Sequence, residues 1–494
     1  MVSGVMTSRR SRQGARPPAA ADLWPNLRTN RNYRTDEIRA LDVVEWQKLT
    51  KLVRGRLRGA PLSQAAKRQF REIKRRLTRR RGERHVPLRT EHLIAKQQPC
   101  VILDALMPDR ARRWQPIVRR KARPNIDLRA FSFVLDPIGT MRQLAQVAAA
   151  EATGRSVTMS FLDEVCMDVS PYLVLGLMRR TMAPVLTGGR ITPSIRSMIT
   201  ALGLREFLNM QPIKADARDP TFLPFRVRYS NEAARQSENL TYQPSAIEKL
   251  CDDLVDTVSN WLLWTKGGQL TKKGKGNVAR IVNEPLDNGV RHADLGGRGN
   301  WATAGFLSRV TKIEHDGQAR EVTTCSLAIV STGSTIADTI MTCENPHTLD
   351  RIHRYIDLHA APSRPADLLA TVFALQDGVS RFLQGEGSSR GGVGIMDMLQ
   401  LVMELGQTTR AEDAPTVTLI SGRSCTIVRP PFAPLPPQAG DISLREVWFN
   451  DANDVDLPPD ETHVFTLPCG FPGTIIAIRF CLDPTFVVPP AQPK

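Results

Sequence analysis

The stretch IVNEPLDNGVRHADLGG, residues 281–297, groups side chains that could hold a metal ion and activate a water molecule. On a helix, residues four apart lie on one face, so Glu284, Asn288 and His292 would form one stripe, with Asp287 beside it. A glutamate can take a proton from an attacking water. An asparagine oxygen suits Mg²⁺, which prefers hard oxygen ligands. The same pattern also fits an ordinary solvated helix face. The choice between a metal site and a solvated face therefore depends on other segments of the chain.

A glycine-rich loop follows about one hundred residues later. In QGEGSSRGGVGIMDMLQLVMELG, residues 384–406, Arg390 leads through Gly391, Gly392 and Gly394 into an apolar helix. Unpaired backbone N–H groups at such a helix start bind phosphate, because the amides and the helix dipole both favour an anion. A flexible loop before a buried helix explains the pattern equally well.

Apolar segments on either side of this loop predict a sheet. Residues 323–340 indicate a strand, a turn at Gly333 and a new helix. Residues 416–428 indicate a hairpin around Gly422, and residues 471–480 indicate a further strand. The phosphate-binding loop and the polar stripe would therefore belong to one folded unit.

In order, spacing and content, these segments resemble the GHKL ATPase superfamily, which includes gyrase B, histidine kinases and mismatch-repair ATPases. The first box of that family, E-x-x-x-N-[AG]-x-x-H, is matched by Glu284, Asn288, Gly289 and His292. An Asp directly before the Asn, as Asp287 is here, also occurs in the topoisomerase branch of the family. The family's G-x-G box and its late Gly-Thr strand are matched by Gly392, Gly394, Gly473 and Thr474.

Two departures from the family bear on its chemistry. The second box, D-x-G-x-G, begins with an Asp that accepts the adenine amino group, but here Ser331 replaces that Asp and Thr335 replaces the second glycine. A serine can still accept a hydrogen bond without the charge-assisted strength, so base preference stays open. Pro285 follows Glu284, which predicts that the helix starts near Asn283, after a flexible basic loop.

The resemblance implies a mixed sheet backed by helices, with ATP held between the helices and a mobile lid at 344–390. It implies that Asn288 holds Mg²⁺ against the phosphates and that Glu284 orients and deprotonates the attacking water. The nucleotide-contacting positions would be Asp287, Ser331, Gly333, Arg390, Gly391, Gly392, Gly394 and Thr474. His292 is interpreted as a packed or surface imidazole. A homodimer is common in the family, and a scaffold that binds nucleotide without turnover stays open.

Residues 96–215 alternate strand-like and helix-like patterns, which predicts an α/β layer. Candidate strands cover 98–106, 128–136 and 156–165, with helices at 141–154 and from Ser170 onward. About 60 residues of this part resemble STAS-like domains, in which an Asp-Ser pair at the helix start can accept phosphate. Here Val169 separates Asp168 from Ser170, and Ser170 is interpreted as a helix cap. Joined to a GHKL unit, this part resembles a regulatory switch or a serine/threonine-kinase-like pair.

The predicted fold class is therefore α/β in the broad sense, more narrowly α+β. The predicted organisation is a disordered 1–21, a basic helical region at 22–95, a STAS-like domain at 96–215, a linker at 216–243, a GHKL-type domain at 244–482 and a disordered tail at 483–494.

The positive charge is concentrated near the N-terminus. The chain has a formal net charge of +17, and residues 1–130 hold 33 Lys and Arg against 11 Asp and Glu. Thirteen of these basic residues lie in 51–83, which predicts a contact with nucleic acid or an acidic protein, although a solvated helix face fits equally well. Because the chain lacks a long apolar run or a secretory h-region, we expect no membrane partner and a cytoplasmic protein.

Overall fold

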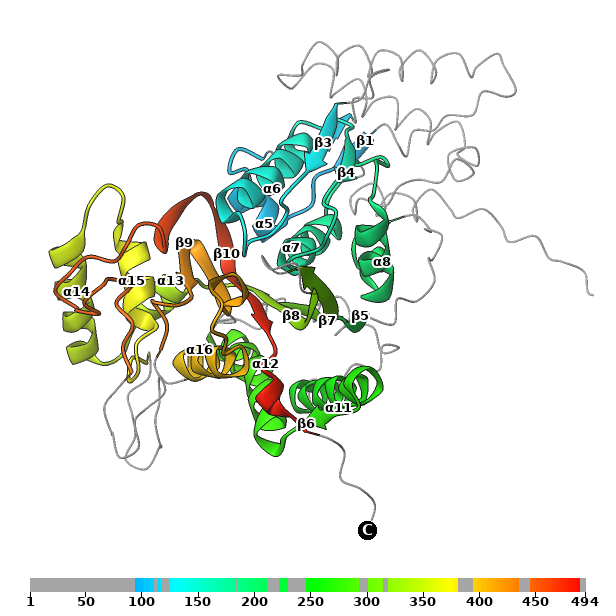
Figure 1. Cartoon of the computed structure of the whole chain (residues 1–494). Helices are drawn as coiled ribbons and strands as arrows, with labels where there is room; N and C mark the ends of the chain where they lie inside the picture. The colour runs from blue at the N-terminus through cyan, green and yellow to red at the C-terminus, as the bar shows by residue number, and fades with distance from the viewer. Residues whose placement is uncertain are drawn as a thin grey trace, which may run out of the picture.

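The computed structural model describes residues 94–110, 114–116, 124–183, 185–210, 222–229, 246–292, 301–313, 319–380, 394–434 and 445–488. They form an α+β protein in which helices cover both faces of an antiparallel sheet (Figure 1). The predicted disordered region 1–21 and residues 22–93 of the predicted basic helical region 22–95, with the basic segment 51–83, lie outside the described residues, and Ile94 and Ala95 belong to a strand.

The central sheet has five strands in the order β5–β7–β8–β10–β9. Their bounds are Phe222–Tyr229 for β5, Trp301–Ile313 for β7, Ala319–Thr332 for β8, Val464–Cys481 for β10 and Thr416–Val428 for β9. Every pairing in it is antiparallel, so the expected mixed sheet is wrong.

One face of the sheet packs against three helices, which lie together in Figure 1. They are α11 (Ala246–Lys266), α12 (Lys272–His292) and α16 (Gly394–Leu405). Beyond β9 lie α13 (Ile336–Ile340), α14 (Pro346–His359) and α15 (Ala366–Ala374). A short ladder of β6 (Gln269–Leu270) and β11 (Val487–Val488) joins the start of α12 to the C-terminal segment.

The opposite face packs against an α/β unit. Its parallel strands are β3 (Asn125–Leu128) and β4 (Thr158–Phe161), and β1 (Ile94–Lys96) pairs with β2 (Trp114–Pro116). Its helices are α5 (Val101–Leu106), α6 (Pro137–Ala152), α7 (Ser170–Arg179), α8 (Pro193–Ala201) and α9 (Leu204–Phe207). Buried side chains of α5, α6 and α7 share one hydrophobic core with the strands, so the unit and the sheet fold against each other.

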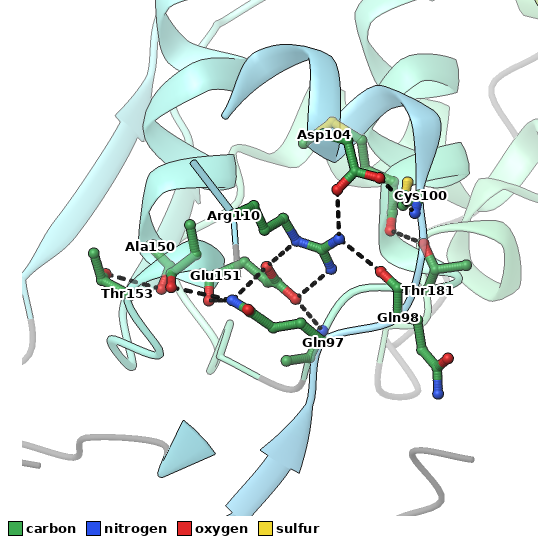
Figure 2. A network of polar contacts seen from close by, with 12 residues as sticks. Gln97, Gln98, Cys100, Asp104, Arg110, Ala150, Glu151, Thr153 and Thr181 are labelled. Carbon is green, nitrogen blue, oxygen red and sulfur yellow. Dashed lines mark hydrogen bonds and ion pairs between the residues drawn. The ribbon is translucent and has the colours of Figure 1, made fainter. Parts of the chain in front are cut away.

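A buried ionic network fixes the start of this α/β unit (Figure 2). Arg110 donates from Nε to Glu151 Oε2 at 2.7 Å and from Nη2 to Oε1 at 2.9 Å, and both side chains are fully buried. Burial by itself lowers the pKa of Arg110, but the bonds to Glu151 and Asp104 outweigh it and the pKa is raised. Gln97 also donates to Glu151. The network ties the segment 97–110 to the last turn of α6.

Several predicted elements are confirmed. The helix predicted at 141–154 is the main part of α6, the strand at 156–165 contains β4, and the strand–turn–helix at 323–340 is β8 followed by α13. The strand predicted at 471–480 lies within β10. Each of these segments has a long, regular apolar period, which is the strongest local signal for an element.

The short apolar run at 98–106 forms α5, so the predicted strand is wrong. Periodicity cannot separate a short buried helix from a strand. The Asp104 carboxylate accepts a hydrogen bond from the backbone N–H of Cys100 at 3.3 Å, which satisfies a donor at the start of the helix. The strand predicted at 128–136 is also largely wrong, because β3 ends at Leu128.

The predicted linker at 216–243 contains β5, so this part of the boundary is wrong. Among the strands that the structure describes, β5 pairs only with β7, at the edge of the sheet. Pro224 is compatible with that position, because an edge strand has backbone N–H groups that need no partner in the ladder. Residues 483–488 of the predicted tail are also ordered, as a 3₁₀ turn at Pro484–Phe486 and β11.

The hairpin predicted at 416–428 is a single strand, β9. Gly422 has φ 61°, and the pairing with β10 shifts register nearby. The glycine therefore bends one continuous strand where it was expected to reverse the chain. The lid predicted at 344–390 is wrong for its described part, because α14 and α15 bury Ile352 and Leu368 completely in the core.

Candidate functional site

Helices α12 and α16 pack side by side and run in opposite directions. Lys273 Nζ lies 2.9 Å from Glu404 Oε2, and Arg280, two turns further along α12, pairs with Asp397, two turns earlier in α16. By this register the next turn of α12, which carries Glu284, lies level with the first turn of α16. The structure therefore brings the predicted catalytic residue to the helix start formed by Gly394.

Helices α12 and α16 both run along the strands of the sheet, toward the end of β8. Val278 and Ile281 of α12 line an apolar pocket with Leu327 of β8, so the following turn extends toward the end of β8. At its other end, α16 is anchored where the Leu405 carbonyl accepts a hydrogen bond from the backbone N–H of Asp483 at 2.8 Å. The Glu284 and Gly394 ends thus point toward the sheet edge where β8 ends.

Polar side chains form a cross-strand row at that edge. Ser331 pairs with Trp301 on one side and with Thr474 on the other, and Thr474 pairs with Ser421. Alternate residues of a strand share a face, and the neighbours of Ser331 and Thr474 at two-residue spacing, Ile329 and Ile476, lie in the core beneath α12 and α16. The hydroxyls therefore face the side of the sheet that carries Glu284.

Two glycines shape this edge. Gly473 has φ 134°, and a Cβ built on it would lie 2.1 Å from the Ser331 carbonyl oxygen. Gly333 has φ 144°, and its N–H donates to the Pro472 carbonyl at 3.1 Å. Only glycine adopts these backbone angles without strain, so both residues are needed for the close approach of β8 and β10.

Two arginines surround the first turn of α16. Arg280 and Arg445 both bind the Asp397 carboxylate, and Arg445 Nε also donates to Asp377 Oδ2 at 2.6 Å. Burial lowers the pKa of Arg445, but the hydrogen bonds to Asp377 and Asp397 outweigh it and the net shift is upward. Neither arginine was predicted from the sequence, because nothing in their local pattern places them near Gly394.

The first box lies on a helix, as predicted, but the predicted helix start is wrong. Helix α12 begins at Lys272, and the Thr271 hydroxyl caps it by accepting a hydrogen bond from the N–H of Gly274 at 2.9 Å. The basic segment 271–276 is therefore the first turn of the helix. Pro285 is buried inside α12, so the Ile281 carbonyl lacks its usual helical donor.

Some predicted site residues cannot be placed. Asp287, Asn288 and His292 belong to the α12 backbone, but their side chains lie outside the described part of the structure. Arg390, Gly391 and Gly392 fall in the segment between the described ranges 319–380 and 394–434. The predicted residues that the structure does bring to one end of the sheet are Glu284, Ser331, Gly333, Gly394 and Thr474.

The Asp168–Ser170 pair of the α/β unit differs from the candidate site because its two side chains bond to each other. Ser170 does not cap α7 as predicted, since its hydroxyl donates to Asp168 Oδ1 at 2.7 Å. Asp168 also accepts the N–H of Phe133 at 2.7 Å, and both members of the pair are almost completely buried. Burial raises the pKa of Asp168, against the effect of the bonds from Ser170 and Phe133. This pair is a closed, internally satisfied contact.

Comparison with known proteins gives no relative: no family model, no curated protein and no solved structure matches this chain. Within the described ranges, no group of three or more His, Cys, Asp or Glu side chains is arranged to hold a metal ion. Among the described helices, none has the length and apolar character needed to cross a membrane.

Proposed function

We propose that residues 246–488 bind ATP with Mg²⁺ at the sheet edge between α12 and α16 and hydrolyse it. The observation that carries this proposal is the convergence of three separate segments on one place. Glu284 on α12 lies level with Gly394 at the start of α16, and the hydroxyls of Ser331 and Thr474 face the same side of the sheet. These are segments in which the sequence resembles the GHKL boxes.

Each part has a chemical role in the proposal. The N–H groups at the start of α16 suit phosphate oxygens, and the guanidinium groups of Arg280 and Arg445 lie within one turn of them, with their charges balanced by Asp397 and Asp377. Asn288 would hold Mg²⁺ through its amide oxygen, consistent with the preference of that ion for few protein ligands and several waters. Glu284 would take the proton from a water attacking the terminal phosphorus.

The proposal includes a regulatory switch that couples this site to the α/β unit. Val330 and Ile475, the chain neighbours of Ser331 and Thr474, are buried in the core shared with that unit. A nucleotide that moves β8 or β10 would therefore alter contacts with α6 and α7, because packed interiors transmit small shifts. The STAS-like character of the unit and a nucleotide-driven homodimer belong to the same proposal.

The first test is binding by the full chain. A thermal-shift measurement compares Mg²⁺ alone with Mg²⁺ plus ATP or ADP. A ligand present at about one hundred times its dissociation constant adds about 2.7 kcal/mol to the free energy of unfolding, which is easily detected. No rise in Tm with any nucleotide would end the proposal.

Hydrolysis is tested separately with Glu284→Gln, using Glu164→Gln on the exposed surface of the α/β unit as the matched control. We expect the Glu284 variant to keep ATP binding and to lose phosphate release by about 100-fold or more, the usual contribution of a general base. The control should retain both. If the natural sequence binds ATP without releasing phosphate, the protein is a nucleotide-binding scaffold, and the enzymatic part of the proposal is wrong.

A further inference from the structure

Arginines are concentrated in the part of the α/β unit that leads from α7 to β5. The described residues of 170–229 include seven arginines, no lysine and one acidic residue, Glu206. By contrast, residues 131–494 as a whole hold 34 Lys and Arg against 39 Asp and Glu. The excess of positive charge is therefore local, and it is separate from the basic segment 51–83.

Contacts between the ends of α7, α9 and β5 bring several of these arginines together. At the end of α7, Arg179 donates from Nε to the Leu208 carbonyl and from Nη2 to the Asn209 carbonyl, both at 2.9 Å. The next residue, Arg180, has its guanidinium carbon 4.6 Å from the centre of the Tyr229 ring in β5. The positive charge of α7 therefore lies where these three elements end.

The charges at this place are poorly balanced. Among the described residues, neither Arg179 nor Arg180 bonds to a carboxylate. Partial burial lowers the pKa of Arg179 to about 10, because its cation loses water and gains only carbonyl partners. Arg205 of α9 lies 3.2 Å from Glu206, but that carboxylate is 86% exposed, so water screens the pair. An anion bound here would stabilise all three guanidinium groups.

We infer that Arg179, Arg180 and Arg205, here called the arginine surface, bind the phosphodiester backbone of a nucleic acid. Guanidinium groups match phosphate oxygens with paired N–H donors. A protein partner is less suited, because protein interfaces have an apolar centre, and the described residues of 170–229 expose no large hydrophobic side chain. Interfaces with nucleic acid are more polar and more positively charged.

The contact should not depend on base sequence. Tyr229 is the aromatic side chain beside the arginine surface, and its ring already contacts Arg180 and lies 4.9 Å from the Phe207 ring. It therefore offers no free face on which a base could stack. The remaining interaction is with phosphate groups, which carry no sequence information.

The other end of the sheet carries the opposite charge. Residues 446–461 include six acidic and no basic residues. They contact the end of α14, where His359 Nε2 lies 2.8 Å from the Val455 carbonyl oxygen. Strands β5 and β9 are the two edges of the sheet, and Figure 1 shows α14 and β5 at opposite ends of the view. A polyanion is repelled from residues 446–461 and attracted to the arginine surface.

The experiment measures binding of the full chain to a short DNA duplex of mixed sequence and, in parallel, to a single-stranded RNA. Fluorescence anisotropy is recorded over a range of salt concentrations without ATP, so the result does not depend on the nucleotide site. Arg180→Ala combined with Arg205→Ala should reduce the slope of log K against log salt by about 2 for the duplex. Affinity at about 0.1 M salt should fall by about tenfold or more.

The matched control is Arg351→Ala combined with Arg354→Ala, which removes the same charge from two exposed positions of α14. It should leave the salt slope unchanged. The basic segment 51–83 is present in every protein compared, so it cannot produce a difference between the two variants. If Arg180→Ala with Arg205→Ala does not fold, Arg180→Gln alone, at an exposed side chain, should still reduce the slope by about 1.

Several outcomes would overturn the inference. The natural chain could bind neither nucleic acid, the arginine variant could keep its affinity and slope, or the control could lose as much as the arginine variant. Polyglutamate that displaces the nucleic acid at equal charge concentration would assign the surface to an acidic protein, which also contradicts the inference. A selective loss in the arginine variant supports it, and the tighter of the two probes shows whether DNA or RNA is held.

Discussion

Two polar clusters lie on opposite sides of the central sheet, and they differ in how far the surrounding protein encloses them. In the α/β unit, Arg110 and Glu151 form a two-bond ion pair and Asp168 is held by Ser170 and Phe133. On the other side, Ser331 is 9% exposed, and its hydroxyl makes no hydrogen bond to another described residue but is not fully enclosed. A closed polar cluster fixes a fold, whereas an open one has capacity left for a ligand.

The largest effect should come from breaking the closed cluster. Glu151→Ala leaves the guanidinium of Arg110 buried without its main partner, which should lower the free energy of unfolding by about 3–5 kcal/mol. Denaturant unfolding followed by circular dichroism measures the change. Glu206→Ala is the control, because its carboxylate is 86% exposed, and it should be nearly neutral. A loss below about 1 kcal/mol for Glu151→Ala would contradict a structural role for the network.

The second-largest loss of stability should come from disturbing the close approach of β8 and β10. Gly473→Ala forces a Cβ toward the Ser331 carbonyl at a backbone angle that alanine avoids, so we expect a loss of about 1–3 kcal/mol. Gly276→Ala in α12 is the control, because no atom lies within 4 Å of the added Cβ. This control should stabilise the protein by about 0.5–1 kcal/mol through helix propensity, as thermal unfolding would show. Equal effects of the two changes would refute the strand geometry.

Ser170→Ala tests the closed cluster at a single hydroxyl. The change removes a donor from the buried Asp168 carboxylate, so stability should fall by about 1–2 kcal/mol. Thermal unfolding with and without ATP provides the measurement. Because the proposed switch couples α7 to the nucleotide site and such coupling is reciprocal, the added stability from ATP should also change. An unchanged ATP effect would contradict the regulatory part of the proposal.

Ser331→Ala should have the smallest effect on the fold. Removing a hydroxyl that has no partner leaves the free energy of unfolding within about 1 kcal/mol of its original value and can raise it. Nucleotide affinity should nevertheless fall by about three- to tenfold, the effect of one net hydrogen bond. Parallel denaturant unfolding and nucleotide titration separate the two quantities. A destabilised protein with unchanged nucleotide affinity would show that Ser331 supports the fold and does not contact the nucleotide.

Prediction from the sequence succeeded where local periodicity is long, and it failed where distant contacts decide. The stripe of Glu284 was correctly placed on a helix, yet the start of that helix was misjudged, because Pro285 was given more weight than the Thr271 cap. A proline is tolerated inside a helix when burial of neighbours such as Leu286 offsets its cost of about 3 kcal/mol. Local rules could not weigh that burial.

The candidate site shows the same division between features that local patterns predict and features that distant contacts decide. Ser331 and Thr474 were selected from the sequence, but their direct pairing depends on the register of β8 and β10. Ser421 and Arg445 were missed altogether, since each reaches the site only through strand pairing or helix packing. No local motif could have indicated either residue.

By itself, the sequence determined the helical periods, the turn glycines and the residue types able to bind a nucleotide, because these depend on neighbours within a few positions of the chain. Only the tertiary structure decided that the α/β unit shares a core with the sheet, that Glu284 lies level with Gly394, and that Ser331 pairs with Thr474. These features depend on burial and on pairing between distant segments, which no local pattern contains.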